Sequence, residues 1–304
     1  MASIKEKVTE ALNETRLLTL GCTVLFGFQL NAAFHPGFER IPSHARGLDG
    51  AALALMMGAL ALLMAPAPFH RLVAEGEDRP AVHRFTTRMT EWALAPFSLA
   101  IASDVFIVVE KGFGVPAGIA LGALFGVLAL FFFYLVGLIC RSDIRVRSQA
   151  MSKIFEEPEP TSLHEKIKTL MTEARVNLPG VQALLGFQFT VVLSDAFDRL
   201  PPSSVAIHIA SLILVGIAVI LLMAPAAFHR IAADGEDLPE VDTFGVWAIL
   251  GSMIPLAVGL CGDFYVVLAK VTDAAMFSAA AAALAFLVFA GLWGAYPLWR
   301  RRRK

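Results

Sequence analysis

The sequence predicts an all-α, polytopic integral membrane protein with eight transmembrane helices in two parallel four-helix repeats. Composition is the first reason. The chain is 57% hydrophobic and 17% charged, with a mean hydropathy of +0.67, whereas soluble domains are roughly 45–50% apolar and about 25% charged. The second reason is a set of eight apolar segments, each close to the roughly 20 residues that a helix needs to cross a bilayer. The third is an internal repeat, which sets the architecture before any local pattern is interpreted.

The repeat is visible as short motifs that recur at a constant offset of 159 residues. Gly27-Phe28-Gln29 returns as Gly186-Phe187-Gln188, and the stretch MAPAPFHR at 64–71 returns as MAPAAFHR at 223–230. A polar residue that both copies keep inside an apolar segment is therefore a better functional candidate than one found in a single copy.

Each half opens with a short amphipathic helix. Ser3 with Glu6, and Ser162 with Glu165, have the spacing of a capping box, in which a hydroxyl and a carboxylate three residues later satisfy the first backbone N–H groups. Apolar residues then follow at helical spacing. Two roles stay open for these helices, a position on the membrane surface or a lead-in to the first span.

Eight spans follow the two amphipathic helices. They are expected at 17–35, 48–68, 90–110, 115–139, 178–196, 204–227, 245–269 and 274–297. In the fourth span, Gly118, Gly122 and Gly126 form a ridge of small residues at which two helices can approach closely.

A charged, proline-containing linker at 142–161 separates a first repeat (1–141) from a second repeat with a basic tail (162–304). Four spans are an even number, so both repeats start and end on the same side. Such parallel repeats are related by an axis along the membrane normal.

The basic residues predict the orientation. Of the 25 Lys and Arg residues, one side of the predicted topology holds only Arg40, Arg46, Lys111, Arg199 and Lys270. The other side holds both termini and is cytoplasmic by the positive-inside rule. We therefore expect a multi-pass protein of the bacterial inner membrane with both termini inside, the lipid bilayer as its first partner, and no cleaved signal peptide.

Several classes of function are disfavoured. The net charge of −1 gives no reason to expect a nucleic-acid partner, and Cys22, Cys140 and Cys261 have no metal-site spacing. No metal and no cofactor are expected. The chain also lacks a recognisable nucleophile–base pair and a nucleotide-binding loop, so we do not expect an enzyme.

The paired Gly-Phe-Gln and Met-Ala-Pro-x-x-Phe-His-Arg motifs resemble a bacterial family of small four-span integral membrane proteins of unknown function. Members of that family are similar to one copy of the unit. The resemblance implies that this chain is a tandem fusion of subunits that otherwise pair as separate chains. It carries over no site residues.

Asp104 and Asp263 are the foremost site candidates, since they occupy matching positions in the third span of each repeat. An ionisable residue in a span costs roughly 2.5–3.5 kcal/mol on insertion scales and by default marks a functional site. The alternative is a structural role, with each aspartate hydrogen-bonded or paired with Lys111 or Lys270, seven residues along the same helix face.

Gln29 and Gln188 lie within the first span of each repeat, and Asn31 and Thr190 follow two residues later. Amides in a membrane either join helices by hydrogen bonds or line a polar ion pathway beside the aspartates. Both interpretations stay open.

A second set of paired polar residues closes the second span and begins the loop after it. These residues are His70, Arg71, Glu77, His229, Arg230 and Glu236. Cations at a helix C-terminus satisfy the last carbonyls. Paired histidines and acids also have the chemistry of a pH-sensitive or cation-sensitive gate.

From these residues we expect an ion channel or ion-coupled transporter for an inorganic cation or proton, because aspartate rings attract cations. A homodimer is expected, since it would place four units around one axis. Two alternatives remain: a non-transporting scaffold or sensor with a cytoplasmic partner, and a membrane enzyme or haem protein. A haem site is disfavoured because paired axial histidines would have to lie at membrane depth, whereas the histidines of this chain fall near the ends of the spans.

Overall fold

The computed structural model describes residues 4–135, 161–231, 233 and 236–303, and nearly all of them are helical, with no strand among them. The all-α prediction is therefore confirmed for the described part of the chain. Most of the predicted linker at 142–161, and Cys140 with it, lies outside the described residues.

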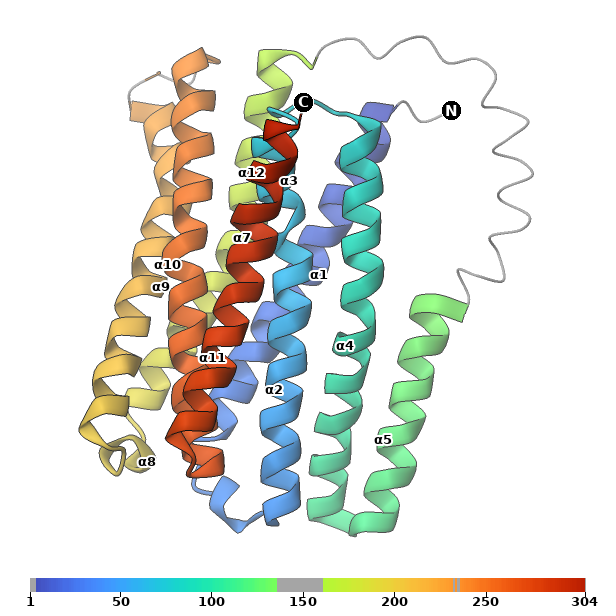
Figure 1. The fold of residues 1–304 in the computed structure, drawn as a ribbon, viewed down its shortest axis with the longest axis vertical. Coiled ribbons are helices and arrows are strands. Elements are labelled where there is room, and N and C mark those ends of the chain that lie inside the picture. Colours follow the sequence, from blue (N-terminus) through green and yellow to red (C-terminus); the bar gives the residue numbers. More distant parts are fainter. Residues whose placement is uncertain (1–3, 136–160, 232, 234–235, 304) are drawn as a thin grey trace.

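The first half contains four long helices joined by short connections (Figure 1). Its elements are α1 (Ile4–Ala32), the 3₁₀ turn η1 (Phe38–Arg40), α2 (Ser43–Met64), α3 (Pro66–Leu72), α4 (Pro80–Phe113), α5 (Val115–Leu130) and the π-helical turn η2 (Phe131–Leu135). Pro66 and Pro80 stand at the first helical position, where a missing N–H costs nothing.

The second half follows a similar order, with the single helix α9 (Pro202–Ile231) in place of α2 and α3. Its elements are α7 (Leu163–Val192), α8 (Asp195–Asp198), α9, α10 (Pro239–Thr272), α11 (Ala275–Phe289), the π-helical turn η3 (Ala290–Ala295) and α12 (Tyr296–Arg302). The predicted capping box is present at α7, where the Ser162 hydroxyl accepts from the Glu165 N–H at 3.4 Å and the Glu165 carboxylate accepts from the Ser162 N–H at 3.3 Å. Ser3, of the matching box, lies outside the described residues.

The two amphipathic segments are not separate helices. Each continues without a break into the first apolar segment of its half, giving α1 and α7. In α7 the helix runs on through Pro179 and Gly180, which stand at the junction, and Gly180 packs closely against Thr23 of α1.

Six helical segments in the described residues are long and apolar enough to cross a membrane: 43–72, 80–113, 115–135, 202–229, 239–272 and 275–302. The predicted first spans, 17–35 and 178–196, belong to α1 and α7 and are not among the six. Both helices end early, at Ala32 and Val192. Their apolar parts are thus shorter than a full span, and the count of eight stays a prediction.

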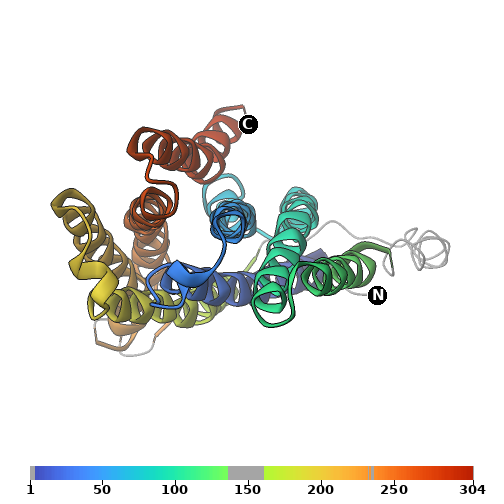
Figure 2. The same ribbon diagram turned by 90° about the horizontal axis from the view of Figure 1, so that it is seen from below.

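The described chain ends lie at the same end of the bundle, which we call the terminal end (Figure 1). The connections 33–42 and 193–201 lie at the opposite end. Seen along the bundle, α1 and α7 cross one face, and α11 lies on the other side of α2 and α10 (Figure 2). Helix α9 and the α4–α5 pair flank this centre from opposite sides.

Residues at matching positions of the two halves meet where α1 and α7 cross. The rings of Phe28 and Phe187 lie 4.5 Å apart, and Asn31 Nδ2 donates to Thr190 Oγ1 at 2.7 Å. Gly27 lies directly against the Phe187 ring, so that a side chain at Gly27 would collide with it. This crossing joins the first half to the second.

The last helices of the two halves take different neighbours. Trp293 of η3 donates from Nε1 to the Ala61 carbonyl of α2 at 2.9 Å, and the Tyr296 ring stacks near Phe69 and Phe85 of the first half. Tyr134, at the position matching Trp293, instead donates to the Glu91 carbonyl within its own half. The C-terminal helices therefore close onto the first half, whereas α5 stays beside α4.

The glycine ridge of α5 is a close contact with α4. A Cβ built on Gly122 would lie 2.9 Å from Phe106 Cβ and 3.0 Å from the Ala102 carbonyl oxygen. We predict that Gly122→Leu forces α5 away from α4 and costs about 1–3 kcal/mol, the usual cost of overpacking. Thermal unfolding in detergent measures the loss. Gly21→Leu is the matched control, because Gly21 has no neighbour within 4 Å, and an equal effect of both changes would contradict the prediction.

Candidate functional site

The first polar cluster joins three helices of the first half near the opposite end. Gln29 of α1 donates from Nε2 to both carboxylate oxygens of Asp104 on α4, at 2.8 and 3.0 Å. Asp49 of α2, which is 6% exposed, lines the same cavity. The cluster thus brings two carboxylates and one amide together inside the bundle.

The cavity at this cluster has a volume of about 510 Å³. Its walls are largely apolar, and its polar lining residues are Gln29, Asn31, His35, Asp49, Asp104 and Lys111. Lys111 and His35 converge over Gly37. A Cβ atom built on Gly37 would lie 3.2 Å from Lys111 Nζ and 3.3 Å from His35 Nδ1. The basic groups therefore gather around the loop that follows α1.

The cluster holds more hydrogen-bond acceptors than donors. Asp49 Oδ2 and Gln29 Oε1 are buried and have no hydrogen-bond partner among the described residues. A buried acceptor without a donor costs about 1–3 kcal/mol. The arrangement is therefore suited to receive a cation or another donor at this point.

The second polar cluster has the same glutamine and aspartate but a different third residue. Gln188 donates to Asp263, and His208 Nδ1 lies 2.9 Å from Asp263 Oδ1. The other ring nitrogen of His208 lies 3.2 Å from the Gln188 carbonyl oxygen. All three side chains are at most 3% exposed. Here a histidine of the chain lies directly beside the carboxylate.

The second cluster is also closed. Its cavity is about 10 Å³ and is lined by Leu30 of α1, by Phe34 in the turn after α1, and by Val191 and Val267 beside the polar groups. The residues that match Leu30 and Phe34 in the second half are Phe189 and Leu193, and they are exposed rather than folded over the first cluster. Asp104 and Asp263 line separate cavities.

The chain is similar to one known family. A family model described as a family of unknown function (DUF6328) matches residues 3–137 and again residues 156–297. The chain belongs to this family. The two matches agree with the tandem arrangement that the sequence motifs indicated. No curated protein and no solved structure was found to match the chain.

Each half of this family member carries one Gln–Asp pair, and Asn31, two residues after Gln29, donates to Thr190, two residues after Gln188. The alternative in which the aspartates pair with Lys111 or Lys270 does not agree with the contacts. Asp104 bonds to Gln29, and Lys270 lies instead near Glu39 of the first half, at 3.9 Å. The glutamines therefore join helices and also line the sites.

Sequence reasoning missed Asp49 and the role of His208. The two residues stand at matching positions, because 208 is 159 positions after 49. Comparing the halves for unlike polar residues, in addition to shared ones, would have found this pair. Of the described residues, no group of three or more His, Cys, Asp or Glu side chains is arranged to hold a metal ion.

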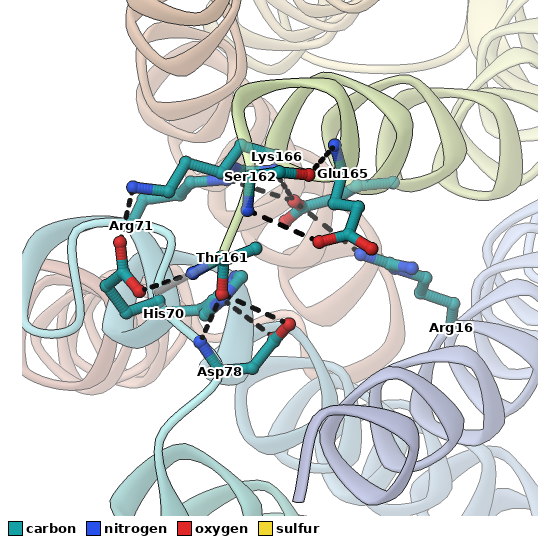
Figure 3. Close-up of polar contacts among 10 residues, drawn as sticks. Arg16, His70, Arg71, Asp78, Thr161, Ser162, Glu165 and Lys166 are labelled. Atoms are coloured by element: carbon teal, nitrogen blue, oxygen red, sulfur yellow. Dashed lines mark hydrogen bonds and ion pairs between the residues drawn. The ribbon is translucent and has the colours of Figure 1, made fainter. Parts of the chain in front are cut away.

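The candidate gate residues of the first half lie at the terminal end and are tied to α7 (Figure 3). Arg71 Nη2 lies 3.0 Å from Glu173 Oε2, and Arg16 Nη2 lies 3.7 Å from the same oxygen. His70 Nε2 lies 3.8 Å from Asp78. All five side chains are at most 8% exposed. The cluster closes this end of the bundle with a network of buried charges.

Glu77 extends that network to the start of the second half. Its carboxylate lies 2.5 Å from Lys166 Nζ and accepts from the Thr161 N–H at 3.1 Å. Burial opposes ionisation of Glu77, but Lys166 and the Thr161 N–H outweigh it, so the pKa of Glu77 lies below its usual value. The carboxylate is therefore charged at neutral pH, as its pairing with Lys166 requires.

The matching residues of the second half are more open. His229 is a quarter exposed and lies 3.9 Å from Asp237, while Glu236 is exposed. The side chain of Arg230 lies outside the described residues. The six candidate gate residues are therefore not arranged alike in the two halves. Glu173, Arg16 and Lys166, which sequence reasoning did not select, are the partners that hold the first-half set.

Removing the shared carboxylate tests the terminal-end network. Glu173→Gln leaves Arg71 and Arg16 buried without a counter-charge, and loss of one partner in a buried pair costs about 3–5 kcal/mol. Thermal unfolding in detergent measures the effect. Glu14→Gln is the matched control, since Glu14 stands 159 residues earlier and is exposed. Equal stability of the two variants would refute the network as a stabilising contact.

The two aspartates should differ in their effect on stability. Asp263→Asn removes the buried counter-ion of His208 and breaks an enclosed network, which we expect to cost about 1–3 kcal/mol. Asp104→Asn should cost less, because Asp104 is only partly buried and its amide partner can turn to donate or accept. Chemical or thermal unfolding of both variants decides the order, and a larger loss for Asp104→Asn would contradict it.

Proposed function

We propose that this chain is an eight-span protein of the bacterial cytoplasmic membrane that transports cations or protons. In this proposal its two parallel four-span repeats lie with the terminal end inside. The observation that carries the proposal is the pair of carboxylates, Asp49 and Asp104, in one cavity, together with two buried acceptor atoms, Asp49 Oδ2 and Gln29 Oε1, that have no hydrogen-bond partner among the described residues.

The outer faces of the helices support a membrane location. In the helical segments 115–135 and 275–302, only 12% and 11% of the most apolar stretch of 18 residues is buried inside the protein. Large side chains such as Ile119, Val127 and Leu284 are exposed there. Apolar faces of this extent on helices of spanning length are suited to lipid rather than to water. The basic tail of α12 at the terminal end fits a cytoplasmic anchor.

Contacts between matching residues support the parallel relation of the repeats. Phe28 meets Phe187 and Asn31 meets Thr190, and each pair is separated by 159 positions. When two like units pack around a two-fold axis, residues near the axis meet their own counterparts. Both α1 and α7 run from the terminal end to the opposite end (Figure 1), as an axis along the bundle requires.

Charge complementarity supports a cation as the transported species. The second half supplies His208 to Asp263, whereas the first half presents Asp49 to Asp104 at the matching place. Two carboxylates close together raise the affinity for protons or other cations, because like charges disfavour the doubly ionised form. Acidic groups that line a membrane cavity attract cations from solution.

The terminal end bears on the choice between channel and transporter. The space between Arg16, Glu173 and their apolar neighbours is only about 30 Å³, and Glu173 is also paired with the buried Arg71. A site open at one end and closed at the other corresponds to one state of an alternating-access cycle. We therefore favour an ion-coupled transporter, with the charge network at the terminal end as the closed inner gate.

The decisive experiment measures H⁺, Na⁺ and K⁺ flux in liposomes that contain the purified protein. We expect flux in the wild type and a decrease of at least about tenfold in Asp104→Asn and in Asp49→Asn, because each change removes a site charge. Asp273→Asn is the control, since it makes the same chemical change at an exposed position outside the cavity.

Two results would overturn the proposal. Unchanged flux in both site variants would place the pathway elsewhere. No flux of any of the three ions through correctly folded wild type would favour a scaffold or sensor.

A further inference from the structure

The closed second site shows which kind of group this cluster accepts. The imidazole of His208 lies 2.9 Å from Asp263 and 3.2 Å from the Gln188 carbonyl oxygen. Phe197 packs edge-on to that ring at 5.5 Å, and Phe34 lies 6.2 Å from it. A nitrogen donor with a flat apolar body thus fills the place beside the aspartate.

The open first site shares part of these surroundings but lacks that group. Phe38, which matches Phe197, lines the first cavity together with Gln29 and Asp104. At the position of His208 stands Asp49, which is shorter and an acceptor when ionised. The space is about 510 Å³ in the first half and about 10 Å³ in the second. The first half therefore keeps the glutamine, the aspartate and a neighbouring phenylalanine, and it lacks the imidazole that lies beside the aspartate in the second half.

Size and lining favour an organic ligand over a bare inorganic ion. Pockets for small organic molecules usually have volumes of about 300–1,000 Å³ with mostly apolar walls and few polar groups. Leu25, Phe28, Ile41, Ile107 and Val108 form such walls here. Hard metal cations instead require about six or more oxygen ligands around them. The side chains that line this cavity offer oxygen atoms only from Gln29, Asn31, Asp49 and Asp104.

We infer that the first-half cavity binds a protonated organic amine with an aromatic or apolar body. Its ammonium group contacts Asp104 and Asp49 in the place that His208 takes in the second half, and its body lies against Phe28 and Phe38. The aromatic rings also attract the cation through their faces. This inference rests on the site of the proposed transport function and names the substrate class of that site.

The basic groups of the cavity set a limit on the ligand. Lys111 and His35 converge over Gly37 and line the same space. A second positive charge on the far part of the ligand would meet them and be repelled. The site is therefore suited to a monoamine, with a single charge at the aspartates.

Calorimetric titration of the purified full chain in detergent tests the inference, with phenethylamine at neutral pH as the probe. We expect one binding event per chain, at least about tenfold weaker in Asp104→Asn and Asp49→Asn and unchanged in Asp273→Asn. The neutral analogue 2-phenylethanol should bind at least about tenfold more weakly to the wild type, a comparison that depends on no variant. Asp49→His should also lose binding, because it introduces the internal cation of the second half.

The outcomes separate this inference from the proposed function. Equal binding of the alcohol and the amine, or equal amine binding in the aspartate variants, overturns the amine site. If the amine does not bind while flux of inorganic cations still depends on Asp104, the inference fails and transport stands. If the amine binds through the aspartates but no flux of any cation, the amine included, is found, the inference stands and transport fails.

Discussion

A carboxylate inside an apolar helix bundle must find hydrogen-bond donors, and much of this structure follows from how it does so. Gln29 supplies them to Asp104, and Gln188 supplies them to Asp263. Each bond joins the first helix of a half to its third helix. Because an unsatisfied charge in such surroundings is costly, the bond holds α1 to α4 and α7 to α10 in a fixed register.

The third residue of each cluster then decides whether the site is complete. In the second half the His208 ring lies beside the carboxylate, and Leu30 and Phe34 of the first half cover the cluster. In the first half Asp49 adds a second acid, and the cavity remains open. The two sites thus differ both in the residue at one matching position, Asp49 against His208, and in the side chains that cover them. One stabilises the bundle, and the other is available to a ligand.

The crossing of α1 and α7 joins the two halves. Gly27 permits the close approach of Phe187, and Asn31, which lines the first cavity, bonds to Thr190. At the terminal end, Glu173 of α7 holds Arg71 and Arg16 of the first half. A rotation of α7 against α1 would therefore act on both ends of the molecule, which is the kind of rigid-body motion that alternating access uses.

The sequence by itself determined the helical class, the tandem units, the paired aspartates and the glutamines beside them. Hydrophobicity and local periodicity are properties of neighbouring residues, and the internal repeat showed which polar residues both units keep. The α7 capping box and the glycine ridge were predictable for the same reason, since both depend on spacing within one helix.

Only the tertiary structure decided that Asp49 joins Asp104, that His208 lies beside Asp263, and that Glu173 holds the arginines at the terminal end. These contacts connect residues far apart in the chain, and no local pattern encodes them. The difference between the two halves was equally hidden, because it depends on which helix covers which site. Leu30 and Phe34 close one cluster, while their counterparts Phe189 and Leu193 remain exposed. Packing of the whole bundle, rather than the repeated motif, settles that choice.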